Sequence, residues 1–172
     1  MTLYENEIDD AVGLLEGEIV SFVPELVRTP SLPDHEHEVQ NRVAERLEQL
    51  GVEVVQFPVR FDEVREHPAF SDDGFSSDER VNVVGIWKGT NGGRSIILNG
   101  HVDVVSTGDE SVWEDSPWSG VEKDGCIFGR GSCDMKGGLA AGIFAVKALR
   151  KAGVSLKGNV TVQSVIGEES GG

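Results

Sequence analysis

Three short clusters of histidine and carboxylate residues combine the residue types that bind divalent metals in proteins. The first cluster runs from Asn99 to Asp103. On a strand, His101 and Asp103 share one face, because they are two positions apart. A carboxylate behind the ring is a common support for an imidazole metal ligand, so this spacing indicates a metal site. For this cluster alone, a hydrogen-bonded histidine at a strand end is the other interpretation.

The second cluster is the segment Gly129–Gly138, in which Asp134 stands just before an expected helix. Asp134 can bind a metal, or it can cap the helix, which is the commonest role of an aspartate at that place. Cys133 is expected to be a small buried thiol, because a site of oxygen and nitrogen ligands does not need it. Lys136 can be an exposed lysine at the start of the helix.

The third cluster is the pair Glu168–Glu169, which follows an apolar segment. Adjacent carboxylates repel each other, and a metal ion beside them would relieve the repulsion and leave one of them available as a base. The alternative is a solvated pair in a loop. All three clusters lie at the ends of expected elements, where α/β sheets usually place their sites.

The elements that must position these clusters alternate between strands and helices. Pro24 should kink or divide the first helix, Asp34 can cap the second, and Asp124-Gly125 predicts a hairpin turn. The run Ile96–Leu98 predicts a strand buried on both faces. The expected fold class is therefore α/β, a layered sheet with helices on both faces. Periodicity favours helices over residues 8–26, 34–50 and 135–152, strands over 52–59, 81–87, 95–103 and 159–166, and a long loop over 61–80.

The overall charge excludes some classes of partner. The 172 residues include 30 acidic and 15 basic ones, for a formal net charge of -15. Such a surface argues against binding to nucleic acid or to an anionic membrane. It indicates either a solvated surface that aids solubility or a host with high internal salt. The two cysteines suggest a reducing compartment, and the start of the chain has no signal-peptide pattern, so we expect a cytoplasmic protein.

Taken together and in order, the clusters resemble the three amino-terminal metal-site motifs of the M20-type metallopeptidases. This family includes acetylornithine deacetylase, succinyl-diaminopimelate desuccinylase, aminoacylase and the glutamate carboxypeptidases. The resemblance covers nearly the whole chain, and Asn82–Gly85 looks closest to the acetylornithine deacetylase-like branch. The segments that carry it are Leu98–Val105, Gly129–Gly138 and Gly167–Glu169.

The resemblance implies a role for each site residue. His101 would bind one metal ion, with Asp103 holding its ring, and Glu169 would bind a second ion. Asp134 would bridge the two ions, and Glu168 would be the general base and acid. The implied cofactors are two divalent metal ions, zinc in the first place with cobalt as the alternative. A cis peptide bond between Asp134 and Met135 is also implied.

The resemblance further implies a metal-dependent hydrolase that cleaves the amide bond of an N-acyl amino acid, through a water activated between two metals. Residues 1–172 would be the amino-terminal part of a zinc-peptidase-like catalytic domain, and the dimerisation domain and remaining ligands would lie elsewhere. The full-length protein would be a homodimer, and residues 1–172 alone would be inactive. A dipeptidase, a formyl-pyrimidine deformylase and a truncated, non-catalytic interaction module are the alternatives.

Overall fold

A mixed β-sheet forms the centre of the computed structural model, which describes residues 4–71, 74 and 80–171. Within these residues the strand order is β1-β2-β6-β3, with β2 antiparallel to both β1 and β6 and β3 parallel to β6. The carboxyl ends of β3 and β6 therefore meet at one end of the sheet; β3 ends within the first cluster, at His101, and the third cluster follows β6. The strands are β1 (Glu53–Pro58), β2 (Val81–Trp87), β3 (Ile96–His101) and β6 (Val160–Val165).

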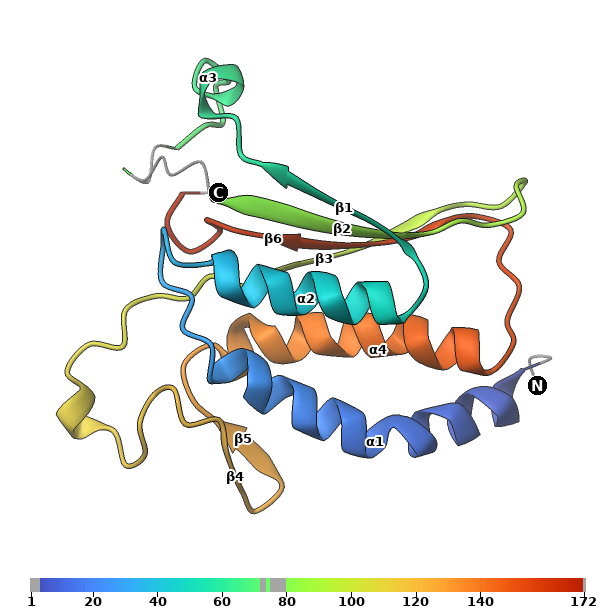
Figure 1. Cartoon of the computed structure of the whole chain (residues 1–172), viewed down its shortest axis with the longest axis horizontal. Helices are drawn as coiled ribbons and strands as arrows, with labels where there is room; N and C mark the ends of the chain where they lie inside the picture. The colour runs from blue at the N-terminus through green and yellow to red at the C-terminus, as the bar shows by residue number, and fades with distance from the viewer. Residues whose placement is uncertain (1–3, 72–73, 75–79, 172) are drawn as a thin grey trace.

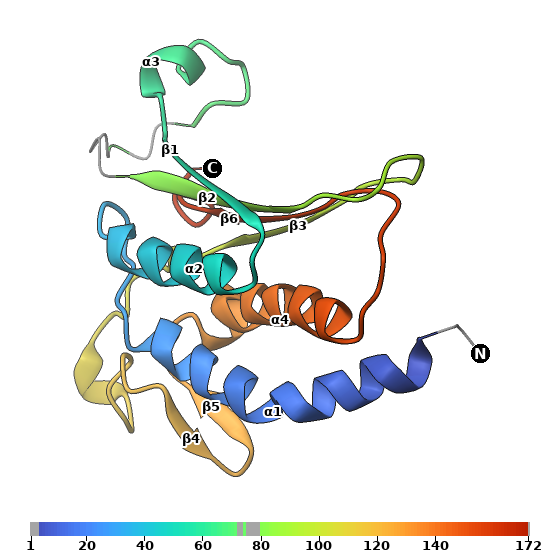
Figure 2. The ribbon, with the colours of Figure 1, turned by 45° about the vertical axis from the view of Figure 1, so that its right-hand side comes forward.

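The long helices of the described chain form two layers on one side of this sheet (Figures 1 and 2). Helix α2 (His37–Gln49) packs on β1 and β2, and α4 (Gly137–Lys151) packs on β3 and β6. Helix α1 (Glu5–Val27) packs on α4, farther from the sheet. The predicted α/β layered class is confirmed, but within the described residues the long helices cover one face of the sheet and not both.

One burial prediction is wrong, and the open face of the sheet accounts for Ile97 alone, because Ile96 shares the face of Leu98 and is the first residue of β3. Ile96 and Ile97 are 53% and 58% exposed, although the run Ile96–Leu98 predicts burial on both faces. β3 is the last strand of the described sheet, and only one of its faces receives the core through Leu98. A run of apolar residues indicates a strand whose surface favours burial, but it does not identify the residues that would pack against that surface.

Local signals set some element boundaries and miss others. The hairpin of β4 (Val121–Lys123) and β5 (Cys126–Phe128) turns at Asp124-Gly125, where both φ angles are positive, as predicted. Asp34 does not cap α2, because the helix begins later, after Glu36. Helix α1 runs through Pro24 without being divided. The expected loop over residues 61–80 contains the short helix α3 (Phe61–Val64) and lies partly outside the described residues, as do residues 1–3 and 172.

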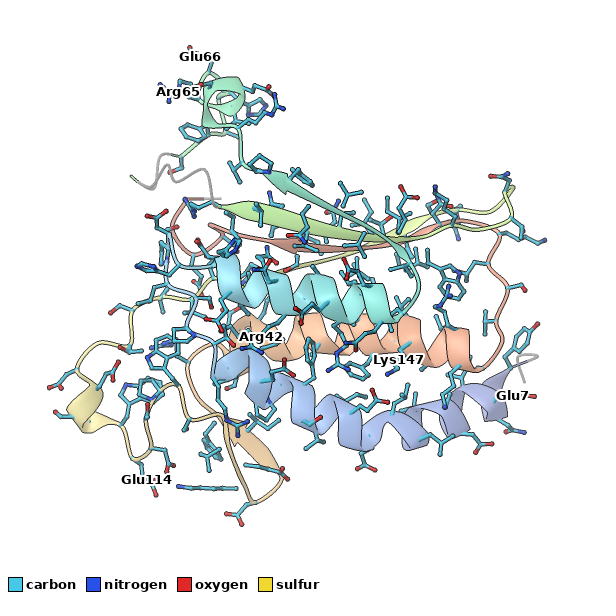
Figure 3. The ribbon with its side chains drawn as sticks, viewed as in Figure 1. Glu7, Arg42, Arg65, Glu66, Glu114 and Lys147 are labelled. Atoms are coloured by element: carbon cyan, nitrogen blue, oxygen red, sulfur yellow. The ribbon has the colours of Figure 1, made fainter. Side chains whose placement is uncertain are left out.

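The contact between α1 and the helices above it is apolar inside and charged outside. Phe22 of α1 packs against Phe144 of α4 with ring centroids 5.9 Å apart, and the guanidinium of Arg46 lies 4.5 Å from the Phe22 centroid. Figure 3 shows Arg42 of α2 and Lys147 of α4 near α1, where each pairs with a glutamate of that helix. This packing fixes α4, whose first residues, Gly137 and Gly138, are the last residues of the second cluster. No helix in the described part of the chain is long and apolar enough to cross a bilayer.

Candidate metal centre

His101, Asp134 and Glu169 meet at the end of the sheet where β3 and β6 stop. His101 is the last residue of β3, Asp134 lies in the turn η2 (Ser132–Lys136) that leads into α4, and Glu169 follows β6. One nitrogen or oxygen atom of each side chain lies within 4.8 Å of those of the other two. The fold thus brings one residue from each of the three sequence clusters to a single point.

The hydrogen bonds of His101 define which ring nitrogen faces this point. The buried ring places Nδ1 3.1 Å from the backbone carbonyl oxygen of Asp103. A carbonyl oxygen only accepts, so Nδ1 carries the proton, and Nε2 of the neutral ring presents a lone pair. Nε2 lies 3.2 Å from Oδ1 of Asp134 and 3.6 Å from Oε2 of Glu168. The lone pair of Nε2 and these carboxylate oxygens can lie so close together only with a proton on Nε2 or a cation between them.

Asp103 connects His101 to the loop that carries Glu169. Its Oδ2 accepts a hydrogen bond from the backbone N–H of Glu169 at 2.9 Å. Its Oδ1 lies 3.6 Å from Nδ1 of His101 and has no hydrogen-bond partner among the described residues. The nearest support of the imidazole is therefore the backbone carbonyl of Asp103, while its carboxylate holds the loop after β6 in place.

Crowded carboxylates give the site an electrostatic reason to hold a cation. Burial, and next the carboxylate of Asp134, raise the pKa of Glu169; Glu168 and Asp103 act in the same direction, while His101 lowers it. A neighbouring cation removes this like-charge repulsion and favours the ionised carboxylates. One imidazole nitrogen and two carboxylate oxygens also form a donor set that zinc or cobalt accepts. The residues present therefore fit a divalent metal.

Asp134 is not used as a helix cap in this fold. Its φ and ψ of -121° and 102° are not helical, and α4 begins after Lys136 without a side-chain cap. The Asp134–Met135 peptide bond is cis, as predicted. The side chain of Asp134 is 75% exposed and faces His101, so its carboxylate is available to a ligand.

Cys133 and Lys136, which lie close to Asp134 in the sequence, differ from prediction in their burial. Cys133 is exposed, although a buried thiol was expected, and Lys136 is fully buried, although an exposed lysine was expected. The turn η2 points position 136 inward, where Nζ donates hydrogen bonds to the carbonyl oxygens of Leu26 and Thr29 at 2.9 Å each. Burial lowers the pKa of Lys136 to about 7.

Further supporting residues came without any local sequence signal. Ser31 is fully buried beside the segment after β3, and the buried ion pair of Glu36 and Arg80 joins the start of α2 to the start of β2. These residues are far from the three clusters in sequence, and each is polar, so patterning alone places them on the surface.

Comparison with known proteins points to one family. The model of a family described as peptidase family M20/M25/M40 matches residues 97–172. The chain is 36% identical over 159 residues to N-formyl-4-amino-5-aminomethyl-2-methylpyrimidine deformylase of Bacillus subtilis, covering 90% of this chain and 33% of that protein. It is 31% identical over 152 residues to succinyl-diaminopimelate desuccinylase of Gluconacetobacter diazotrophicus, covering 88% and 35%. The chain thus spans about a third of the length of these relatives.

Solved structures show the same arrangement of elements. The fold superposes on human carnosine dipeptidase 1 with a TM-score of 0.76 and 22% identity, over 95% of this chain and 35% of that one. At this identity the likeness concerns the fold. It agrees with the layered α/β arrangement that brings the three clusters together.

Proposed function

The chain belongs to peptidase family M20/M25/M40, and on this basis we propose that it provides metal ligands and the general base of a hydrolase acting on the amide bond of an N-acyl amine. Family members are metal-dependent hydrolases of amides and peptides. The observation that carries the proposal is the convergence of His101, Asp134 and Glu169, each of which offers one ligand atom within 4.8 Å of the other two. His101, Asp134 and Glu169 are the residues that would hold the metal.

The bound ions would lower the pKa of a water molecule and polarise the substrate carbonyl. Glu168 is suited to the proton transfers, because its side chain is 60% exposed and its Oε2 lies 3.6 Å from His101 Nε2. We assign to Oε2 of Glu168 the acceptance of a proton from the attacking water and its delivery to the leaving amine. Asp103 orients His101 through its backbone carbonyl and Glu169 through its carboxylate.

The relatives suggest the order in which to test substrates. The deformylase of Bacillus subtilis supports an N-formyl aminomethylpyrimidine as the first choice, since it aligns with most of this chain. The desuccinylase supports an N-succinyl diamino acid as the second. Acetylornithine is the third, because Asn82–Gly85 resembles the acetylornithine deacetylase-like branch. Zinc as the metal, two as the number of ions, and a homodimeric, cytoplasmic whole protein are parts of the same proposal.

The test uses the protein expressed over the full length of its reading frame. Metal is removed with a chelator, zinc or cobalt is titrated back, and hydrolysis of the three substrates and a dipeptide is followed. We expect turnover of at least one N-acyl amine to depend on metal, and Asp134→Asn to lose metal and turnover together. Equal activity with and without metal would contradict the proposal. Metal binding without turnover of any substrate would support the non-catalytic interaction module instead.

A further inference from the structure

Lys136 connects the turn that carries Asp134 to the carboxyl end of α1. Its side chain is fully buried, and Nζ donates to the carbonyl oxygens of Leu26 and Thr29 at 2.9 Å each. Leu26 lies in the last turn of α1 and Thr29 just after its end. Carbonyls at the carboxyl end of a helix carry partial negative charge, which favours an amine donor beside them. A buried charge is costly unless it is hydrogen-bonded, so these two contacts account for a lysine in this place.

The residues that follow α1 also hold the segment after His101. Ser31 is fully buried; its Oγ donates to the carbonyl oxygen of Val102 at 2.6 Å, and its own carbonyl accepts from the N–H of Val104 at 3.1 Å. The short stretch Thr29–Ser31 is therefore bonded on one side to Lys136 and on the other to the residues directly after His101. It lies between two of the three ligand-bearing segments.

Gly131, directly before η2, packs closely against Val104. Gly131 has φ +80°, and a Cβ atom there would lie 2.5 Å from Cγ1 of Val104. Its carbonyl accepts the backbone N–H of Lys136 at 3.0 Å, which closes the turn around Asp134. Asp134 itself is largely exposed, so the place of its carboxylate depends on how the turn is anchored.

We propose that Lys136 is a positioning residue for the metal centre: by binding the carboxyl end of α1 it holds Asp134 opposite His101 and so sets the metal affinity of the folded protein. The inference rests on the proposed function, because it concerns the same site. Lys136 does not contact the ion or the substrate in this arrangement; it acts through the main chain of the turn η2. Loss of a supporting contact of this kind typically lowers metal affinity by about 10–100-fold.

A merely structural role predicts a different result. If Lys136 only contributes to packing, Lys136→Met changes the free energy of unfolding of the metal-free protein and leaves the metal dissociation constant of the folded state unchanged. If it positions Asp134, the dissociation constant rises even where the variant is fully folded. The two quantities are measured separately, by urea unfolding without metal and by competition with a chelator in the absence of urea.

The experiment compares Lys136→Met and the control Lys147→Met in the protein expressed over its full reading frame. Lys147 lies on α4, the helix that follows η2, and pairs with Glu18 of α1, so it offers a matched loss of one lysine contact to α1. We expect Lys136→Met to lose about 10–100-fold in zinc affinity and to alter the visible spectrum of bound cobalt, and Lys147→Met to stay within about twofold of the parent.

Ser31→Ala keeps the ammonium group and removes the bond to Val102, so it serves if Lys136→Met does not fold. We expect it to weaken zinc binding in the same direction. Parent-like affinity and cobalt spectrum in the folded Lys136→Met protein, or in Ser31→Ala where that variant alone folds, would overturn the inference and leave the proposed function standing. A parent protein that binds no metal would overturn the proposed function as well.

Discussion

The buried ion pair of Arg80 and Glu36 allows a sharp test of how the surroundings of the site are stabilised. Arg80 Nη2 lies 2.9 Å from Glu36 Oε1, and the two side chains are 3% and 1% exposed. The other carboxylate oxygen of Glu36 has no hydrogen-bond partner among the described residues. The charge of Asp103 raises the pKa of Glu36, so the pair lies within electrostatic reach of the metal centre. Arg80→Met would remove the cation and leave the carboxylate buried.

The loss of stability expected for Arg80→Met depends on the burial of the ion pair. An exposed ion pair with the same separation serves as the comparison. Arg60 and Glu63 are also 2.9 Å apart, but their side chains are 70% and 65% exposed. Removing one partner of a buried pair costs about 3–5 kcal/mol, since a buried charge remains uncompensated. Removing one partner of an exposed pair costs about 0–1 kcal/mol. We therefore expect Arg80→Met to lower the free energy of unfolding several times more than Arg60→Met does.

The pH dependence of this loss provides a second readout. Burial raises the pKa of Glu36, and the hydrogen bond and charge of Arg80 lower it. A carboxyl group whose pKa is raised on folding contributes stability below its unfolded pKa of about 4.3, and this contribution is lost as pH rises through the folded value. Arg80→Met raises the folded pKa further. The deficit of the variant should thus be smaller at pH 5 than at pH 8.

Urea unfolding followed by tryptophan fluorescence at both pH values measures the two free energies for the parent, Arg80→Met and Arg60→Met. A loss in Arg80→Met no larger than that in Arg60→Met would refute the assignment of a tightly buried pair. A large loss that is equal at pH 5 and pH 8 would refute the claim that the remaining carboxylate causes it. Lost packing of the arginine stem would then be the explanation.

Three further predictions concern the site and the charge of the chain. Glu168→Gln should keep its metal and lose about 10²–10⁴ in turnover, whereas Glu169→Gln should lose metal and recover partly in excess zinc; metal analysis beside kinetics decides, and the opposite pattern would reverse the two roles. A protein limited to residues 1–172 should bind zinc weakly and turn over negligibly beside the full reading frame, and comparable rates would contradict this. The chain has 30 acidic and only 15 basic residues, so its charges repel one another in the folded state. Salt screens this repulsion, so 2 M KCl should raise the urea midpoint of unfolding; an unchanged midpoint would argue against such repulsion.

The positions of the strands that carry the ligands were predictable from the sequence, whereas the side-chain directions in the turn η2 were not. Strands were predicted over residues 95–103 and 159–166, close to the observed β3 and β6, and the parallel pairing of these two strands brings the clusters together. The direction of side chains within η2 was not predictable, because the turn is neither helix nor strand and has no fixed period. Cys133 and Lys136 were both misplaced for that reason.

The exposed carboxylates Asp134 and Glu168 were identified from the sequence; of the buried supporting residues, only Asp103 was, through its spacing from His101. Asp134 and Glu168 are 75% and 60% exposed, and such residues are identified by their chemistry alone. Asp103, Lys136 and Ser31 are fully buried, and a buried polar group is tolerated only where the fold supplies its hydrogen-bond partners. Those partners are backbone groups from distant segments, which no local pattern reveals. The exposed carboxylates therefore rely on a buried layer for their position, and the affinity of the centre should depend on both.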